Sequence, residues 1–355
     1  MDEIQRNAVM DALTKIAGTN ATRAAFIYAI KQFEHELAVQ GVFNRDELSG
    51  PLIDALFDDN TILKKSLVDG TVMEFYYRTK IAREFFMSEP AQPDHVWEPQ
   101  TTKLLTQLCQ GKQQALVGGA YFGDHVIAMA KRLQNGICHA FEPNADQAAM
   151  LARNISHNQL HNVVVNACGL WSSSNANVRL VGNDSLAGGI DLNDDNQGVA
   201  IPVVTIDDYC EQQGGVALDL IMLDIEGGEH EVLKGAQRQL ARADDAPVLV
   251  FEVHRHYVDW DNGLMQTALI QYLQQFGYCF HAIRDYNGNE NMAGYPVELI
   301  PLDDIYLAGP PHGFNVLAVK DRRLLTSPFF AFCRGVSPKL LRHRDPALHQ
   351  PLHKA

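Results

Sequence analysis

Four acidic residues crowd the stretch LDIEGGEHEVLKGA, residues 223–236, at the end of the apolar run LDLIML. Asp224 and Glu226 lie two positions apart, so on an extended backbone their carboxylates project to one side. A carboxylate that ends a buried strand must find a compensating partner, which makes both residues candidate functional groups. Glu231 instead fits the first turn of the following helix, where the helix dipole favours an acid.

A second group of candidates alternates along VFEVHRHY, where a strand would place Glu252, His254 and His256 on one face. These residue types can bind a metal, but one short strand rarely supplies a complete site, and we expect no metal. The ordinary pKa of histidine lies near neutrality, so His254 is the first candidate for a general base and Glu226 the second. A histidine that is merely satisfied by hydrogen bonds is an equal alternative.

Glycines and an acid mark two further strand ends. The stretch LVGGAYFG, residues 116–123, lets the backbone approach a ligand closely, but as a GxGxxG motif it is weak, since Ala120 occupies the middle glycine position. About twenty residues downstream, Glu142 could accept hydrogen bonds from both hydroxyls of a ribose. The alternatives are a tight turn without a ligand and an acid at a helix N-terminus.

The elements that position these residues alternate from about residue 100 onward. Strands are expected at ALVGG, ICHAFEP, VVVNA, LDLIML and PVLVFEVH and near residues 278–284 and 315–320, with amphipathic helices after ALVGG, ICHAFEP, LDLIML and PVLVFEVH. This alternation predicts an α/β fold whose mostly parallel sheet carries helices on both faces. Ligands bind at the carboxyl ends of such strands, so the candidate groups are expected to meet there.

The regions before and after this part have a different pattern. Apolar residues at helical spacing predict helices over 2–16, 24–37, 46–57 and 61–87, and three prolines in SEPAQPDHVWEP indicate a linker. The predicted organisation is a helical N-terminal region at 1–90, a linker at 91–100, an α/β domain at 101–324 and a C-terminal arm at 325–355.

Composition limits the possible partners. The 355 residues contain 29 Lys plus Arg against 43 Asp plus Glu, a formal net charge of −14, which disfavours nucleic acid or an anionic membrane. No stretch is long and apolar enough to span a bilayer, and the N-terminus is not a secretory signal. Six scattered cysteines without a CxxC pair indicate reduced thiols, so we expect a cytoplasmic protein.

The motifs AFEPN, NISHN, VTIDDY, LDIEGGEHEVLKGA and VLVFEVH, in this order and at this spacing, resemble those of FkbM-like S-adenosylmethionine-dependent methyltransferases. The resemblance covers roughly residues 100–320, so the α/β domain would be a methyltransferase domain. It implies a Rossmann-like sheet of seven strands with a reversed last hairpin, and S-adenosylmethionine as cofactor. It also implies methyl transfer to a hydroxyl of a small molecule or glycan, commonly a sugar or a polyketide-type natural product.

Carried over by position, the resemblance assigns the methionine side of the cofactor to Gly119, Ala120, Tyr121 and Gly123, the ribose to Glu142, the adenine to Cys168 and Gly169, and the methyl-transfer centre to Asp224 and Glu226. Two positions depart from the family pattern. Val117 stands where the family has an acid that helps to position the cofactor's amino group, and Tyr121 stands where asparagine is usual.

Other functions remain open at this point. The altered first loop favours a methyltransferase-like binding protein with weak cofactor affinity, in which the N-terminal helices serve as a partner or homo-oligomer surface. A nicotinamide oxidoreductase fits the spacing of Glu142 but not Ala120. The Gly- and Asn-rich stretch 181–198 could close over the site, with Asp184 and Ser185 as contacts, although plain flexibility is an equal reading.

Overall fold

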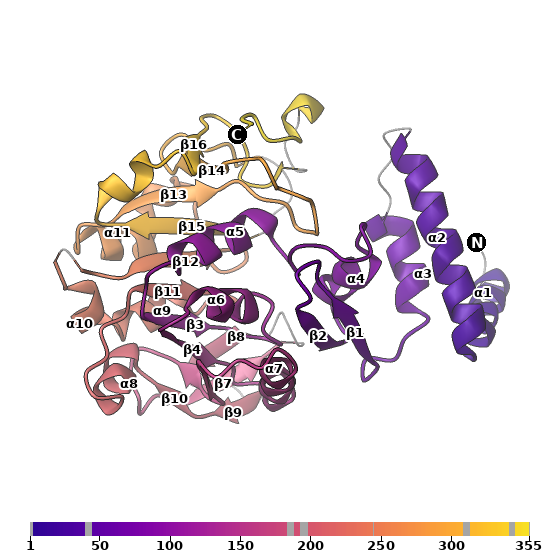
Figure 1. The fold of residues 1–355 in the computed structure, drawn as a ribbon, viewed down its shortest axis with the longest axis horizontal. Coiled ribbons are helices and arrows are strands. Elements are labelled where there is room, and N and C mark those ends of the chain that lie inside the picture. The colour runs from indigo at the N-terminus through magenta and orange to yellow at the C-terminus, as the bar shows by residue number, and fades with distance from the viewer. Residues whose placement is uncertain are drawn as a thin grey trace.

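The computed structural model describes residues 3–39, 45–182, 188–191, 198–243, 245–307, 313–340 and 345–354. Figure 1 shows a large α/β domain beside a smaller N-terminal unit, with the C-terminal segment on the α/β domain. No helix in the described part of the chain combines the length and apolar character needed to cross a membrane. All six cysteines are free, and four of them are buried.

The core of the α/β domain is a mixed sheet, which among the described residues has nine strands in the order β16-β14-β13-β15-β12-β11-β3-β4-β5. Its strands are β3 (Gln114–Gly118), β4 (Ile137–Phe141), β5 (Val163–Asn166), β11 (Leu220–Leu223), β12 (Val248–Val253), β13 (Cys279–Ile283), β14 (Val297–Pro301), β15 (Phe314–Val319) and β16 (Phe330–Phe332). The five strands from β12 to β5 are parallel, and β15 runs antiparallel to both of its neighbours. The predicted α/β class is therefore confirmed.

The predicted count of seven strands is wrong, because β14 and β16 extend the sheet beyond β13. No helix links β13 to β14, so the strand–helix alternation that revealed the other strands does not reveal this one. Strand β16 lies in the segment predicted to be a C-terminal arm and pairs with β14 over three residues.

Helices cover both faces of the sheet. One face carries α5 (Pro99–Leu108), α6 (Val126–Arg132) and α7 (Ala145–His157), and the other carries α8 (Ile206–Gln212), α9 (Glu229–Lys234), α10 (Gln237–Leu240) and α11 (Ala268–Gln274). Successive strand residues point to opposite faces, so Val117 packs in the first cluster and Leu116 in the second. Both faces are buried, which is why the parallel strands are nearly continuous apolar runs.

Smaller elements complete the α/β domain. Two short sheets are formed by β6 (Gly169–Leu170) with β10 (Val203–Val204), and by β7 (Val178–Val181) with β8 (Gly188–Asp191) and β9 (Val199–Ile201). Single 3₁₀ turns occur at η3 (Leu264–Gln266), η4 (Arg322–Thr326) and η6 (Pro346–Leu348).

The N-terminal unit combines helices with a β-hairpin. Its elements are α1 (Glu3–Ala17), α2 (Asn20–Val39), η1 (Arg45–Ser49), α3 (Gly50–Asp54), β1 (Ile62–Ser66), β2 (Val72–Tyr76) and α4 (Lys80–Met87). The helix predicted over 61–87 is wrong, since an antiparallel hairpin precedes α4. The turn between its strands contains Asp69 and a left-handed Gly70, and Thr79 caps α4 by accepting the backbone N–H of Ala82.

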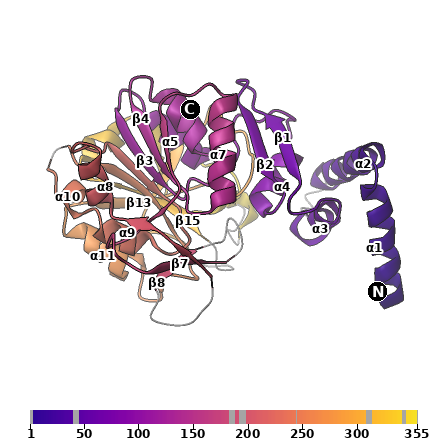
Figure 2. The same ribbon diagram turned by 90° about the horizontal axis from the view of Figure 1, so that it is seen from below.

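Two asparagines of α7 attach this hairpin to the α/β domain, where Figure 2 shows β2 and α7 side by side. Asn154 Oδ1 accepts the backbone N–H of Glu74 at 2.7 Å, and Asn158 Oδ1 accepts that of Val72 at 2.9 Å. Their amide groups donate back to the carbonyls of the same two residues. The asparagines of the NISHN motif, one helical turn apart, therefore bind the edge of β2 as a neighbouring strand would.

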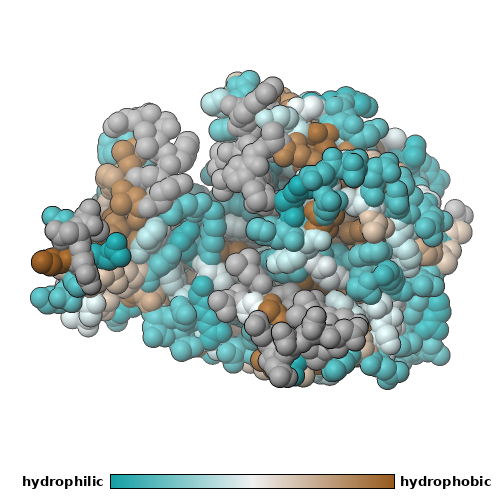
Figure 3. All heavy atoms as spheres, turned by 180° about the vertical axis from the view of Figure 1, so that it is seen from behind, coloured by the Kyte–Doolittle hydropathy of each residue, from teal (hydrophilic) through white to brown (hydrophobic). Residues whose placement is uncertain are grey.

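Apolar side chains remain exposed on the first two helices, which project from the rest of the molecule. Figure 3 shows hydrophobic atoms on this part of the surface. The large exposed apolar residues of α1 and α2 are Ile4, Val9, Met10, Tyr28 and Phe33.

The segment predicted to be a linker is packed rather than exposed. Val96, Trp97 and Glu98 are all buried, and α5 begins directly after them. This segment packs inside the α/β domain, since Glu98 forms hydrogen bonds with residues of β15 and of the C-terminal segment.

Candidate active site

A cavity of about 1170 Å³ lies at the carboxyl ends of the parallel strands and reaches the N-terminal unit. Eight of the ten predicted site residues line it: Gly119, Tyr121, Glu142, Cys168, Gly169, Asp224, Glu226 and His254. The strand order reverses between β3 and β11, with β4 on the other side of β3, so the cavity lies at the switch point of the sheet.

The glycine loop after β3 passes close to the end of β11. Gly119 adopts a left-handed backbone with φ of 77°, and a Cβ at this position would lie 1.8 Å from the carbonyl oxygen of Asp224. Only glycine fits such an approach. The N–H of Asp224 in turn donates to the Gly118 carbonyl, so the loop and the acidic strand end hold each other in place.

Ala120 and Gly123, two of the predicted cofactor contacts, are not among the residues that line the cavity. The N–H of Ala120 donates to the Phe141 carbonyl, and its methyl group packs in the core. Gly123 has a φ of 99° and packs against Leu151 and Ile127. Both small residues let the loop turn into α6 behind the cavity.

Tyr121, the second departure from the family pattern, connects the α/β domain to the N-terminal unit. Its hydroxyl lies 3.1 Å from Oγ1 of Thr79, the residue that caps α4. Its backbone is left-handed, with φ of 46°, and its N–H points to the Glu142 carboxylate. The larger side chain therefore fixes the position of α4 beside the cavity.

Glu142 is held in a single orientation at the end of β4. Oε2 accepts the backbone N–H of Tyr121 and Oε1 that of Asn144, each at 2.8 Å. A carboxylate has about four lone-pair sites, and Glu142 also lines the cavity. This arrangement suits a ligand with two neighbouring hydroxyls, such as a ribose.

Apolar side chains surround the predicted adenine position beside Cys168 and Gly169. Burial raises the pKa of the Cys168 thiol, which therefore stays uncharged. The sequence reasoning missed the neighbouring residues that line this part of the cavity: Leu170, Trp171, Val178, Leu180 and Ile201. Three of them come from β7 and β9, whose short strands gave no periodic signal. Asp184 and Ser185 lie outside the described residues.

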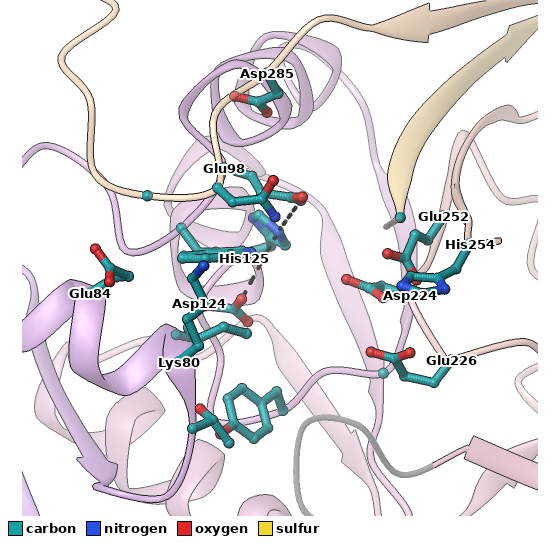
Figure 4. A pocket seen from close by; sticks show the side chains of 18 of the residues that line it. Lys80, Glu84, Glu98, Asp124, His125, Asp224, Glu226, Glu252, His254 and Asp285 are labelled. Atoms are coloured by element: carbon teal, nitrogen blue, oxygen red, sulfur yellow. Dashed lines mark hydrogen bonds and ion pairs between the residues drawn. The ribbon is translucent and has the colours of Figure 1, made fainter. Parts of the chain in front are cut away.

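Four residues at the ends of β11 and β12 form what we call the strand-end wall: Asp224, Glu226, Glu252 and His254. In Figure 4 the three acids point toward one another at the edge of the cavity, and each offers a carboxylate oxygen within 4.8 Å of the others. Burial raises the pKa of Asp224 and of Glu252, and the neighbouring carboxylates raise both further. No Lys, Arg or His of the described chain forms an ion pair with these three acids.

Oxygen ligands of this kind suit a hard divalent cation such as Mg²⁺, and this set differs from the Glu252, His254 and His256 set considered from the sequence. His256 is exposed and does not line the cavity. The same three carboxylates would equally stabilise a positively charged organic ligand.

Glu229 binds the backbone that carries the strand-end wall. Its side chain is buried, and Oε1 accepts the backbone N–H groups of Ile225 and Gly227 at 3.1 and 3.3 Å. Burial raises the pKa of Glu229 to about 7. Glu231 accepts hydrogen bonds from Ser172 and Lys234, in keeping with its predicted structural role.

His254 has a restricted protonation state. Nδ1 accepts the backbone N–H of His256 at 3.1 Å, so the neutral ring carries its proton on Nε2. Burial, together with the nearby His256 and Lys339, lowers the pKa of His254 to about 4. The ring is therefore neutral near pH 7 and is a weaker base than an ordinary histidine.

The opposite side of the cavity includes five charged residues of the N-terminal unit that we call the N-terminal wall: Glu34, Arg45, Asp46, Lys80 and Glu84. Figure 4 shows Lys80 and Glu84 on α4 beside the cavity. Arg45 pairs with Glu34 at 2.6 Å and with Glu84 at 2.7 Å, and Lys80 pairs with Asp46 at 2.6 Å. The sequence reasoning missed this wall, because its members lie up to 50 positions apart on separate elements.

Comparison with known proteins identifies the α/β domain. Residues 118–280 match the family described as the methyltransferase FkbM domain, which confirms the resemblance. No curated protein sequence matches the chain.

Solved structures with a similar backbone include a precorrin-6y C5,15-methyltransferase from Geobacter metallireducens GS-15 (13% identity, TM-score 0.34, 62% of this chain and 88% of that chain). Others are an O-methyltransferase from Bacillus cereus in complex with SAH (14%, 0.31, 62% and 81%) and the O-methyltransferase TomG from Streptomyces achromogenes in complex with SAM (14%, 0.34, 62% and 78%). Similarity at these TM-scores assigns neither a substrate nor a cofactor site to this chain.

Proposed function

We propose that the protein, whose residues 118–280 match the methyltransferase FkbM family, is an S-adenosylmethionine-dependent O-methyltransferase. The acceptor is proposed to be a hydroxyl of a sugar or a related small molecule. The observation that carries the proposal is the position of the carboxylates of Asp224, Glu226 and Glu252, which have no ion-pair partner in the described chain, in the same cavity as Glu142.

The residues of the cavity fit the cofactor. Glu142 lines the cavity at the end of β4, where a carboxylate can accept from ribose hydroxyls, and the apolar surroundings of Cys168 suit the adenine ring. Gly119 and Asp224 both line this cavity and hold its floor close to the ends of β3 and β11. Bound S-adenosylmethionine would supply an electrophilic methyl group on a positively charged sulfur.

The carboxylates of the strand-end wall have two proposed roles. Near a positively charged sulfur, these carboxylates stabilise the bound cofactor more strongly than they stabilise its neutral thioether product. This interaction therefore favours the affinity and orientation of the cofactor rather than the rate of transfer. Asp224 is further proposed as the base that accepts the proton of the acceptor hydroxyl, with Glu226 as the alternative. A new O–C bond forms, the S–C bond breaks, and the hydroxyl proton passes to the carboxylate.

His254 is proposed to position the acceptor rather than to remove its proton. Nε2 carries the hydrogen of the neutral ring, so it can donate a hydrogen bond to the acceptor oxygen or to a neighbouring carboxylate. The lowered pKa of about 4 supports this assignment over the role of general base expected from the sequence.

The acceptor is proposed to lie between the strand-end wall and the N-terminal wall. A volume of about 1170 Å³ exceeds the roughly 300–1,000 Å³ of common small-molecule sites, so it accommodates a cofactor and an acceptor together. Charged and polar side chains dominate the N-terminal wall, which supports a hydroxylated acceptor over an apolar one.

The test is transfer of a radiolabelled methyl group from S-adenosylmethionine to a panel of sugars, glycosides and hydroxylated natural products. We expect label in an acid- and base-stable ether of at least one acceptor, accompanied by an equal amount of S-adenosylhomocysteine. Binding of S-adenosylhomocysteine with labelling confined to amines or carbon atoms would contradict O-methylation but not methyl transfer.

Self-association through the N-terminal helices is a separate proposal. The exposed apolar residues of α1 and α2 support it, because such side chains are usually covered in a stable protein. Light scattering after gel filtration should give a mass above 39.5 kDa, and Tyr28→Asp should return it to the monomer value. A monomer at micromolar concentration would reject the proposal.

A further inference from the structure

A second polar group, made of Glu98, Asp124 and His125, faces the strand-end wall across the cavity (Figure 4). Glu98 immediately precedes α5, and the other two residues end the glycine loop before α6. His125 Nε2 lies 3.9 Å from Oε2 of Glu98 and 4.0 Å from Oδ2 of Asp124, which is longer than a hydrogen bond. The proposed transfer reaction has not used any of the three.

The hydrogen bonds of His125 define which ring nitrogen is free. The Thr102 hydroxyl donates its only hydrogen to the Trp97 carbonyl at 2.8 Å, so at 3.1 Å it accepts from Nδ1 of His125. The neutral ring then has a lone pair on Nε2. This atom is buried and has no hydrogen-bond partner among the described residues, and the His125 side chain is 5% exposed.

The charges of this group are only partly balanced. Glu98 accepts Lys339 Nζ at 3.2 Å and Asn315 Nδ2 at 2.6 Å, so one buried ammonium compensates its charge. No Lys or Arg of the described chain pairs with Asp124, and burial raises the pKa of this carboxyl. A bound cation beside Asp124 would remove that cost.

We propose that Glu98, Asp124 and His125 bind the α-ammonium group of S-adenosylmethionine, an inference that rests on the proposed function. An ammonium has three N–H donors in a compact head, and this group presents three acceptors. The first strand cannot supply the charge, because Val117 packs in the core with its side chain turned from the cavity. Glu98 and Asp124 therefore provide, from neighbouring elements, the negative charge that Val117 lacks.

Calorimetric titration with three nucleosides tests the proposal. S-Adenosylhomocysteine has the amine and the carboxylate, S-adenosyl-3-thiopropylamine keeps only the amine, and 5′-methylthioadenosine has neither. We expect the wild-type protein to bind the thiopropylamine at least tenfold more tightly than methylthioadenosine. Asp124→Asn should remove most of that difference while changing the affinity for methylthioadenosine less than twofold. The matched control is Glu89→Gln, at an exposed carboxylate on the rim of the same cavity.

Glu98→Gln should act in the same direction, but its ties to Lys339 and Asn315 make Asp124→Asn, with no such ties, the deciding variant. Equal weakening of all three ligands, or no change in any, would overturn the ammonium site. Binding of methylthioadenosine by the wild-type protein would in that case leave the proposed function standing. Failure of the folded wild-type protein to bind any of the three would overturn both.

Discussion

The N-terminal wall and the strand-end wall face the same cavity, and both present carboxylates to it, but they differ in how those charges are balanced. On the N-terminal wall, burial alone would raise the pKa of Glu34, yet hydrogen bonds from Arg45 and Ser49 bring it below its ordinary value. On the strand-end wall, burial raises the pKa of Asp224 and the neighbouring acids raise it further. The carboxylates of the N-terminal wall are therefore balanced by cationic partners within the described chain, whereas those of the strand-end wall are not.

This difference indicates a structural role for the N-terminal wall and a ligand-binding role for the strand-end wall. Paired charges such as Arg45 with Glu84 join η1 to α4 and need no ligand. Unpaired, partly buried carboxylates cost folding free energy unless a proton or a bound cation compensates them. A positively charged cofactor is such a cation, so the difference in charge balance predicts that the strand-end wall binds it.

Changing Asp224→Asn should break the strand-end wall most severely. We expect the rate of methyl transfer to fall about 100- to 1,000-fold, because an amide cannot accept the hydroxyl proton. Affinity for S-adenosylhomocysteine should change less than tenfold. The measurement is the initial rate with an acceptor from the screen. His254→Gln is the comparison variant, and its rate should fall less than tenfold. A large loss in His254→Gln beside an active Asp224→Asn would return the role of base to His254.

Removing Glu142 should have the next largest effect, on cofactor affinity. Glu142→Ala is expected to weaken S-adenosylhomocysteine about 100-fold, since it deletes the ribose acceptor and frees the N–H groups of Tyr121 and Asn144. Calorimetry gives the affinity. Glu142→Gln keeps one acceptor oxygen, so its affinity should lie between those of the wild type and Glu142→Ala. Affinity within twofold of wild type would place the ribose elsewhere.

Breaking the N-terminal wall should instead affect stability. Arg45→Met leaves Glu34 and Glu84 without their shared partner, and we expect a loss of about 1–3 kcal/mol in the free energy of unfolding. Urea denaturation measures it, and Arg323→Met, at an exposed pair with Asp321, should cost clearly less. A change in S-adenosylhomocysteine affinity beyond twofold would contradict the division between the two walls.

A further expected effect is a change in the pH dependence of stability. The pKa of Glu229 is about 7 in the folded protein against 4.5 for the ordinary group, so the folded state binds the proton more tightly. Stability from this group is present below pH 4.5 and is lost as pH rises to about 7, by up to about 3 kcal/mol. Glu229→Gln keeps an oxygen for Ile225 and Gly227, and its unfolding free energy should vary less over this range. An unchanged pH profile would show that Glu229 is not the titrating group.

Local patterns in the sequence were sufficient for seven strands of the sheet and for one wall. Apolar runs followed by Gly119, Glu142 and Asp224 predicted strands β3, β4 and β11 and the meeting of their ends, because parallel strands place their carboxyl ends at one edge. The hairpin before α4 was missed, since Met73, Tyr76 and the residues after them also fit helical spacing.

The remaining parts of the site depend on contacts between distant residues. Glu98 meets Asn315 and Lys339 across more than 200 positions, and Arg45 meets Glu84 across 39. No periodic pattern encodes such pairs, so the N-terminal wall and the Glu98 group became visible only in the folded chain. Ala120 and Gly123 show a related limit, because a motif predicts the loop but not which of its residues line the cavity.

Calorimetric titration of the ligand-free wild-type protein with S-adenosylmethionine and S-adenosylhomocysteine, with NAD as the control, tests the central claim most directly. The unpaired strand-end wall and Glu142 predict micromolar binding of both methyl-cycle ligands and no binding of NAD. Absence of binding by folded protein would contradict the account and favour a methyltransferase-like binding protein.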